Sequence, residues 1–118
     1  MASHNETGKE GEELAAKWLK ENGYELLHRN WRYSHYEIDI VATKGKFLHF
    51  VEIKTLNAPA FGFPEAGVTK KKFKNLQRAA DEYLFLNPGH KWIQYDVLSI
   101  IIHRGREHEY FLLEDIFI

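Results

Sequence analysis

The sequence contains no cysteine, which excludes disulfide bonds, cysteine-ligated zinc and cysteine nucleophiles. Any metal ion must therefore be held by carboxylate, histidine or backbone carbonyl groups. The sequence also lacks a long apolar run, because the most apolar stretch, Val97 to Ile102, is far shorter than the roughly 20 residues that a membrane-spanning helix needs. Met1 to Glu10 is polar and lacks the apolar segment of an export signal. We therefore expect a cytoplasmic protein without membrane association.

A strong excess of charge of either sign is absent too, since the formal net charge is −1. Attraction to nucleic acid must then come from a local patch. Residues 69 to 78 include several basic side chains and no acidic one. They lie at the predicted start of a helix, where the helix dipole favours acidic side chains over basic ones. Phosphate binding is one interpretation of these lysines, and a solvated surface is an equally good one. The basic residues are Lys70, Lys71, Lys72, Lys74 and Arg78.

The spacing of apolar and turn-forming residues predicts one domain over residues 1–118, with the order α-β-β-β-α-β-β. A capping-box pattern at Thr7 and Glu10 marks the first expected helix, Lys9 to Asn22. Thr69 is the expected cap of a second helix, which Asn87-Pro88-Gly89 ends. The expected strands are Tyr24 to Arg32, Glu37 to Thr43, Phe47 to Thr55, Trp92 to His103 and Glu109 to Leu113.

The connections favour an α/β fold in which helices flank a mixed central sheet. Hairpins make neighbouring strands antiparallel, whereas a helical crossover after Phe47 to Thr55 allows a parallel pair. The connection Leu56 to Gly67 contains two prolines and two glycines and presents Phe61 and Phe63. We expect these rings to pack on the core rather than to stack on nucleic-acid bases, cover the site or form a dimer contact.

Two neighbouring strands each carry a pair of charged residues two positions apart. The pairs are Glu37 with Asp39 and Glu52 with Lys54. Because successive side chains of a strand point to opposite faces, each pair shares a face, and Ile38 and Ile40 should share the opposite one. A two-residue or four-residue loop around Gly45 brings both pairs to one face. An unbulged three-residue loop would instead set Asp39 opposite Val51.

Three carboxylates on one face repel one another unless a cation or protonation relieves them. Mg²⁺ or Mn²⁺ can do so, because it prefers oxygen ligands and takes one or two carboxylates together with water and phosphate. We therefore interpret Asp39 and Glu52 as metal ligands, with Glu37 as a second ligand or water-orienting group. Lys54 could orient the attacking water or neutralise developing charge.

Plainer interpretations of these charges exist. In one, the strands simply turn a polar face to solvent; in the other, Lys54 forms an ion pair with Glu37 or Glu52. The apolar residues that surround Glu52 and Lys54 favour the functional interpretation, because buried charges are usually paired or bound to metal.

The same residues lie within a longer set of motifs that closely resembles the YraN-like family of small, poorly characterised bacterial proteins. The resemblance covers nearly the whole chain, and the motifs are specific in combination. They are Gly8-Lys9-Glu10-Gly11-Glu12-Glu13-Leu14-Ala15, Gly23-Tyr24, Asn30-Trp31-Arg32, Glu37-Ile38-Asp39-Ile40-Val41-Ala42, Phe50-Val51-Glu52-Ile53-Lys54-Thr55, Lys71 or Lys72, and Tyr95-Asp96-Val97.

This resemblance implies a fold and an active site. The family belongs to the restriction-endonuclease-like, or PD-(D/E)XK and tRNA-endonuclease-like, superfamily and is similar to archaeal Holliday-junction resolvases. An αβββαβ core with its active site on the second and third strands is thus implied. Asp39 would correspond to the catalytic aspartate, and Glu52 and Lys54 to the (D/E)XK half. Glu12 would correspond to the first-helix glutamate of resolvase-like members.

Two positions depart from the family. Tyr36 stands where glycine usually precedes the Glu-Ile-Asp motif, which changes the local backbone and the access to Glu37. Leu56 stands where arginine commonly follows Lys54-Thr55, so one expected phosphate contact is missing.

We predict a Mg²⁺- or Mn²⁺-dependent nuclease that hydrolyses phosphodiester bonds in DNA, with structured or branched DNA as the expected substrate. One alternative is a nucleic-acid-binding or partner-binding module with this fold and little or no turnover. Another is a metal-free structural domain. A homodimer is compatible with the sequence, because many related nucleases pair two sites, but no residue indicates an interface.

Overall fold

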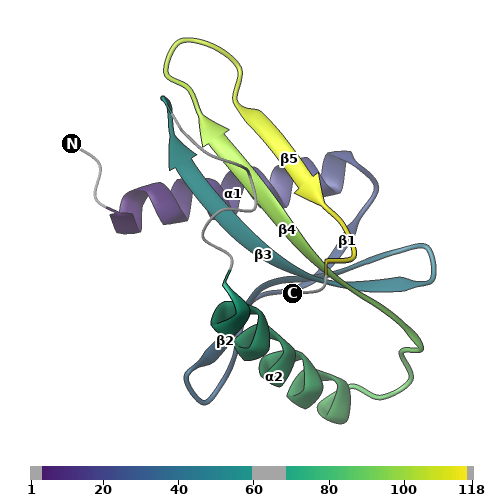
Figure 1. Cartoon of the computed structure of the whole chain (residues 1–118). Coiled ribbons are helices and arrows are strands. Elements are labelled where there is room, and N and C mark those ends of the chain that lie inside the picture. Colours follow the sequence, from purple (N-terminus) through teal and green to yellow (C-terminus); the bar gives the residue numbers. More distant parts are fainter. Residues whose placement is uncertain (1–3, 60–68, 117–118) are drawn as a thin grey trace.

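The computed structural model describes residues 4–59 and 69–116, which form two helices and a five-stranded sheet (Figure 1). The predicted order of elements is confirmed. Phe61 and Phe63 lie outside the described residues. Neither helix in the described part of the chain is long and apolar enough to cross a membrane. The elements are α1 (His4–Glu21), β1 (Glu25–Tyr33), β2 (Tyr36–Lys44), β3 (Phe47–Asn57), α2 (Lys70–Leu86), β4 (Trp92–Ile102) and β5 (Glu109–Leu113).

Two predicted boundaries were wrong by more than one residue. The first helix begins at His4, so Thr7 lies inside it and cannot be its N-cap. No glycine or proline precedes Thr7 within the helix, and extending an existing helix requires only one further hydrogen bond per residue. β3 continues past Thr55 to Asn57, because β4 offers it a partner along its whole length. Leu56 therefore belongs to a strand rather than to the connection.

The second helix begins as predicted. Thr69 has extended backbone geometry, and its hydroxyl accepts a hydrogen bond from the Lys72 backbone N–H at 3.1 Å. This is the normal role of a threonine N-cap. At the other end, the Asn87 N–H donates to the Tyr83 carbonyl at 2.8 Å. The cap fixes where the basic first turn of α2 starts.

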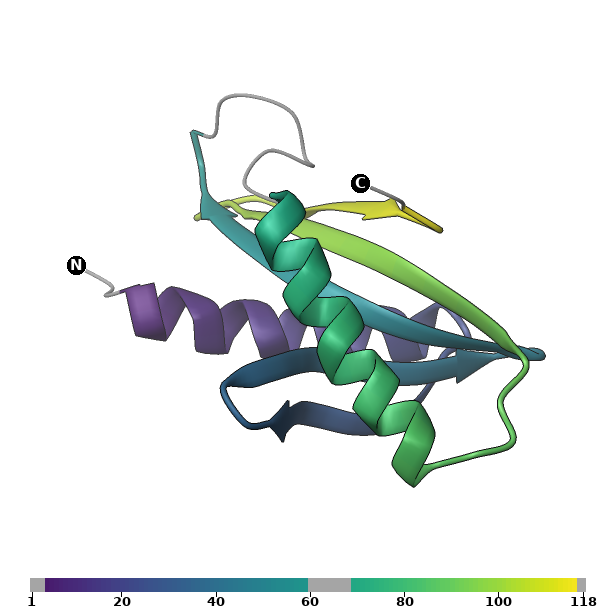
Figure 2. The same cartoon turned by 60° about the horizontal axis from the view of Figure 1, so that its bottom comes forward.

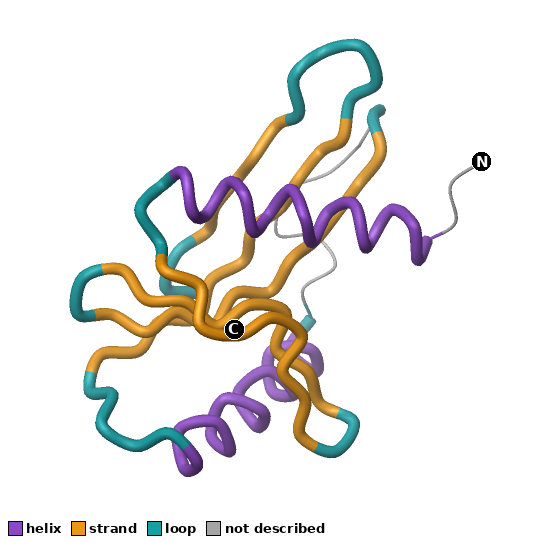
Figure 3. Tube along the Cα trace, turned by 180° about the vertical axis from the view of Figure 1, so that it is seen from behind, coloured by secondary structure: helices purple, strands orange, loops and turns teal. Residues whose placement is uncertain are grey.

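Within the described residues, the sheet has the strand order β1-β2-β3-β4-β5, and β3 and β4 are its one parallel pair. The mixed sheet and flanking helices are thus confirmed. α1 covers one face and α2 the other (Figures 1 and 3). The core under α1 includes Leu19 and Val51, and the core under α2 includes Phe50 and Tyr83.

Two side chains of β2 that are only two positions apart pack in different hydrophobic cores. Ile38 packs in the core under α2, whereas Ile40 packs in the core under α1. The prediction that these isoleucines share a face was wrong. Strands twist, and the twist is larger where a two-stranded ribbon is not held flat by further neighbours. Asp39 lies at this crossing point between the two apolar layers.

A buried polar pair ties the end of the chain to the sheet. Asp96 is fully buried, and its carboxylate lies 2.6 Å from His49 Nδ1. Its other oxygen accepts the Asp115 backbone N–H at 2.9 Å. Asp96 was expected to need a hydrogen-bond partner and no catalytic role, and these two contacts meet that need.

Gly11 marks a close approach of α1 to β3. A Cβ atom at this position would overlap Thr55 Oγ1, so Gly11→Ala must displace the helix or the strand. We expect the free energy of unfolding to fall by about 1 to 3 kcal/mol, measured by urea denaturation. At Gly8 a Cβ would meet no described atom within 4 Å. Gly8→Ala is the control, and equal effects of the two substitutions would contradict this packing.

Candidate active site

β2 and β3 pair closely near their turn and then diverge (Figure 2). The turn is the two-residue Gly45-Lys46, so the even-numbered loop that the site requires is confirmed. Pairing ends at Ile40 and Val51. Beyond that point the Asp39 carboxylate accepts the Ile53 backbone N–H at 2.8 Å, in place of a strand-to-strand hydrogen bond. We call this point the fork.

Two acidic side chains meet at the fork. Continuing the hairpin register by one position sets Asp39 beside Glu52. Burial raises the pKa of Asp39 to about 8, helped by the negative charges of Glu52, Glu37 and Glu12. Burial also raises the pKa of Glu52, although the Lys72 ammonium acts in the opposite direction. The fork thus holds more negative charge than its own cations neutralise.

Asn30 joins two further carboxylates to this group. With its amide nitrogen turned toward them, it donates to Glu12 Oε1 at 3.2 Å and to Glu37 Oε1 at 2.9 Å. Its φ of 52° is left-handed, which asparagine tolerates better than most residues. The Arg32 guanidinium lies 3.5 Å from Glu37 Oε2. The site therefore draws on α1, β1, β2 and β3.

Lys54 lies two positions after Glu52 on β3 and is half-buried. Among the described residues, no ion pair joins Lys54 to Glu37 or Glu52. The ion-pair interpretation of Lys54 was therefore wrong. Glu37, Asp39 and Glu52 are half-buried too, which does not match a fully solvated face.

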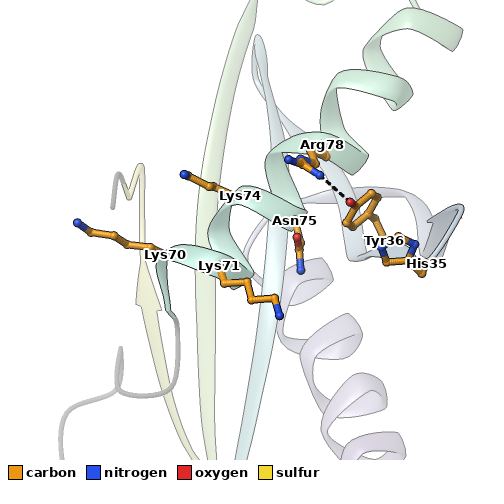
Figure 4. Close-up of a pocket in the computed structure, with 7 residues that line it drawn as sticks. All are labelled: His35, Tyr36, Lys70, Lys71, Lys74, Asn75 and Arg78. Carbon is orange, nitrogen blue, oxygen red and sulfur yellow. Dashed lines mark hydrogen bonds between the residues drawn. The ribbon is translucent and has the colours of Figure 1, made fainter.

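The four predicted phosphate-binding lysines divide between two places. Lys72 acts electrostatically on Glu52 at the fork. The other three line a groove of about 640 Å³ between α2 and the β1–β2 turn (Figure 4). The residues of this basic groove are His35, Tyr36, Lys70, Lys71, Lys74, Asn75 and Arg78.

Comparison with known proteins places the chain in a family. The sequence model of the uncharacterised protein family UPF0102 matches residues 11–100. The chain belongs to this family. A UPF0102 protein of Bacteroides thetaiotaomicron is 44% identical over 105 residues, covering 89% of this chain and 87% of the relative. One from Rhodococcus jostii is 36% identical over 119 residues, covering 99% and 100%.

The UPF0102 match confirms the resemblance that the sequence motifs indicated. The family belongs to the restriction-endonuclease-like superfamily, and the mixed sheet with two helices agrees with an αβββαβ core of that type. The description of UPF0102 assigns no activity, so the function must be argued from the site.

The UPF0102 site fits a hard divalent cation held by two carboxylates. Among the described residues, no three Asp, Glu or His side chains are arranged to hold one metal ion. Mg²⁺ usually takes only one or two carboxylates and fills its other positions with water and substrate oxygen atoms. Asp39 and Glu52 supply that number, and the raised pKa of each shows that a nearby positive charge would be favourable. Glu37 is held by Asn30 and Arg32 instead.

The sequence did not point to Asn30 or Asn75 as site residues, placed Arg78 only within the basic patch, and marked Tyr36 only as a departure from the family. The strand pattern gave no sign that Asn30 adopts a positive φ or reaches two glutamates. The one available signal was its place in the Asn-Trp-Arg motif. The groove residues come from β2, its preceding turn and α2, and only the tertiary fold brings them together.

Asn30 can be tested apart from the backbone conformation it supports. Asn30→Gly keeps the positive φ at little cost but removes the amide between Glu12 and Glu37. The nuclease activity that the sequence predicts, measured with a labelled oligonucleotide and Mn²⁺, should then fall by about tenfold, with little change in stability. Asp115→Gly, at another residue with a φ of 52°, is the control. Unchanged cleavage in Asn30→Gly would rule out this role.

Proposed function

We propose that this UPF0102 protein is a Mg²⁺- or Mn²⁺-dependent nuclease that hydrolyses phosphodiester bonds in DNA, preferring structured or branched DNA. The observation that supports this most strongly is the fork, where Asp39 and Glu52 come together half-buried, with the half-buried Lys54 two positions further along β3. Such an arrangement of acids is unfavourable for folding alone, which points to a functional requirement.

The roles of the acidic residues follow from their surroundings. Asp39 and Glu52 would hold the divalent ion, whose contribution is to acidify a water molecule and to stabilise negative charge on the phosphate. The Ile53 N–H fixes the orientation of the Asp39 carboxylate. Asn30 and Arg32 hold Glu37 at the edge of the site, where it can orient the attacking water.

Hydrolysis forms a bond from the water oxygen to phosphorus and breaks the bond from phosphorus to the leaving sugar oxygen. Negative charge increases on the phosphate oxygens in the transition state, and the ammonium group of Lys54 is suited to neutralise it. The proton lost by water passes to solvent or to Glu37. The leaving oxygen takes a proton from solvent.

Nucleic acid is favoured over a smaller phosphodiester by the basic groove beside the fork. Its cations lie along successive turns of α2, where they can contact a phosphate backbone without reading base sequence. The groove includes Tyr36, which directly precedes Glu37 in the chain. A backbone bound there would lie against the start of β2, the strand that carries Asp39.

The second candidate is a nucleic-acid-binding or partner-binding module with little or no turnover. It is favoured by the groove, whose cations need no metal ion, and by Lys72, which already neutralises part of the charge on Glu52. The nuclease and a nucleic-acid-binding module make the same prediction for DNA binding and opposite predictions for cleavage.

The test is incubation of the purified protein with Mn²⁺ and labelled single-stranded, nicked, branched and fully paired DNA. We expect cleavage that EDTA abolishes and that Lys54→Ala lowers by about 100-fold. Lys17→Ala, at an exposed lysine of α1, is the matched control and should cleave like the wild type. Binding without cleavage of any substrate would favour the module, and absence of both would reject the nuclease and leave a partner-binding module or a metal-free structural domain.

A further inference from the structure

We propose that the basic groove binds one unpaired nucleotide, with its phosphate on the cations and its base against the rings of His35 and Tyr36. This inference rests on the proposed function and specifies its substrate class, namely nucleic acid with a single-stranded segment next to the cleavage point. The groove provides the charge, the aromatic surface and the position that such a ligand requires.

The charge of the groove indicates an anionic ligand. Four cationic side chains line it, and among the described residues none of them forms an ion pair with a carboxylate. Asn75 adds an amide that can both donate and accept hydrogen bonds. Cations gathered without acidic partners repel one another, and a phosphate group would relieve that repulsion. The four are Lys70, Lys71, Lys74 and Arg78.

The aromatic surface of the groove is held in place. Arg78 Nη1 donates to the Tyr36 hydroxyl at 2.8 Å, and its guanidinium carbon lies 5.7 Å from the Tyr36 ring centroid. The centroids of the His35 and Tyr36 rings lie 4.2 Å apart, and the ring planes make an angle of 40°. Figure 4 shows Arg78 and Tyr36 pointing toward each other, with Asn75 and Lys71 alongside. Arg78 thus positions the ring while keeping donors for a phosphate.

An aromatic ring distinguishes unpaired from paired nucleotides. Bases inside a duplex are covered on both faces by their neighbours, so a side chain can stack on a base only where the strand is open. Stacking also tolerates any base, which suits a site that does not read sequence. Lysines alone would bind single and double strands through phosphate. The rings of His35 and Tyr36 therefore carry the selectivity.

The position of the groove relates the nucleotide to the cleavage point. Tyr36 directly precedes Glu37, whose carboxylate is joined through Asn30 to Glu12 at the fork. On α2, Lys71 of the groove is followed by Lys72, whose positive charge lowers the pKa of Glu52. The groove and the fork thus share two chain segments. An unpaired nucleotide in the groove would lie next to the phosphate that is cut.

The test is fluorescence anisotropy with a labelled single-stranded oligonucleotide and with the matching duplex, in EDTA. All binding variants carry Asp39→Asn, so that no cleavage occurs. Tyr36→Leu removes the ring, and we expect its affinity for the single strand to fall by about tenfold and its affinity for the duplex to fall by less than about twofold. Tyr36→Phe keeps the ring and should keep the single-strand affinity. Phe85→Leu, at an exposed aromatic residue of α2, is the control.

His35→Ala provides a second variant, because His35 is exposed and its loss does not disturb the core. It should also weaken single-strand binding selectively. Equal losses for both nucleic acids, or no loss in either variant, would overturn the inference. Cleavage by the otherwise wild-type protein in Mn²⁺ is scored separately. Cleavage with no selective loss would leave the nuclease proposal standing, and selective loss without any cleavage would leave the groove standing as a binding site.

Discussion

Asp39→Asn will lower Mn²⁺-dependent cleavage by at least about 1,000-fold while making the metal-free protein more stable. Activity falls because asparagine is a neutral and weaker ligand for a hard cation. Stability rises because the substitution removes a charge that burial and the neighbouring Glu52 disfavour. The asparagine carbonyl can still accept the Ile53 N–H, so the local geometry is kept.

The difference in unfolding free energy between Asp39→Asn and the wild type will increase as the pH rises. Folding raises the pKa of Asp39 from its ordinary value of 3.8 to about 8, so the folded protein binds more protons than the unfolded chain between these values. The wild-type protein must therefore lose stability relative to Asp39→Asn as the pH rises through this range. At pH 8 we expect a difference of about 1 to 3 kcal/mol, and near pH 4 almost none.

Chemical denaturation of both proteins in EDTA, at several pH values, measures this difference. Asp81→Asn, which removes an exposed carboxylate on α2, is the matched control and should show no such trend. A variant that is less stable than the wild type at pH 8, or that retains cleavage, would contradict the assignment of Asp39.

Mg²⁺ will stabilise the wild-type protein most at the pH values at which the carboxylates of the fork carry the most negative charge. A ligand that binds only the folded state stabilises it in proportion to the logarithm of its concentration. At pH 8 and ten times the dissociation constant, we expect the thermal midpoint to rise by about 5 °C. The rise should vanish in Asp39→Asn and on addition of EDTA, and should be smaller at pH 5, where Asp39 is protonated.

Scanning calorimetry with and without Mg²⁺ measures these midpoints, and Asp81→Asn again serves as the control. Equal stabilisation of the wild type and Asp39→Asn would show that the ion binds elsewhere. No stabilisation at any pH would mean that the acidic fork is not a metal site.

Most of the fold could be predicted because its signals are local. Alternating and helical spacing, Gly23, Gly45 and the Thr69 cap each act over a few residues, and the elements formed where they indicated. The start of α1 was missed because polar residues can extend a helix without an apolar stripe. Local signals therefore define elements better than they define where the elements end.

The candidate site was predictable only in part, because part of it depends on twist and tertiary contact. Alternation and an even loop sufficed to align Asp39 with Glu52. Alternation failed for Ile38 and Ile40, since β2 leaves β3 and changes its face between them. The basic groove could not be foreseen, because the β1–β2 turn meets α2 only after the chain has folded.

The most direct test of the metal-dependent active site is to locate a bound ion. Crystals soaked in Mn²⁺ allow the ion to be identified by its anomalous scattering. We expect one Mn²⁺ within about 2.0 to 2.3 Å of a carboxylate oxygen of both Asp39 and Glu52. Occupied Mn²⁺ sites elsewhere, with the fork carboxylates bound only to water or to Lys72, would contradict it.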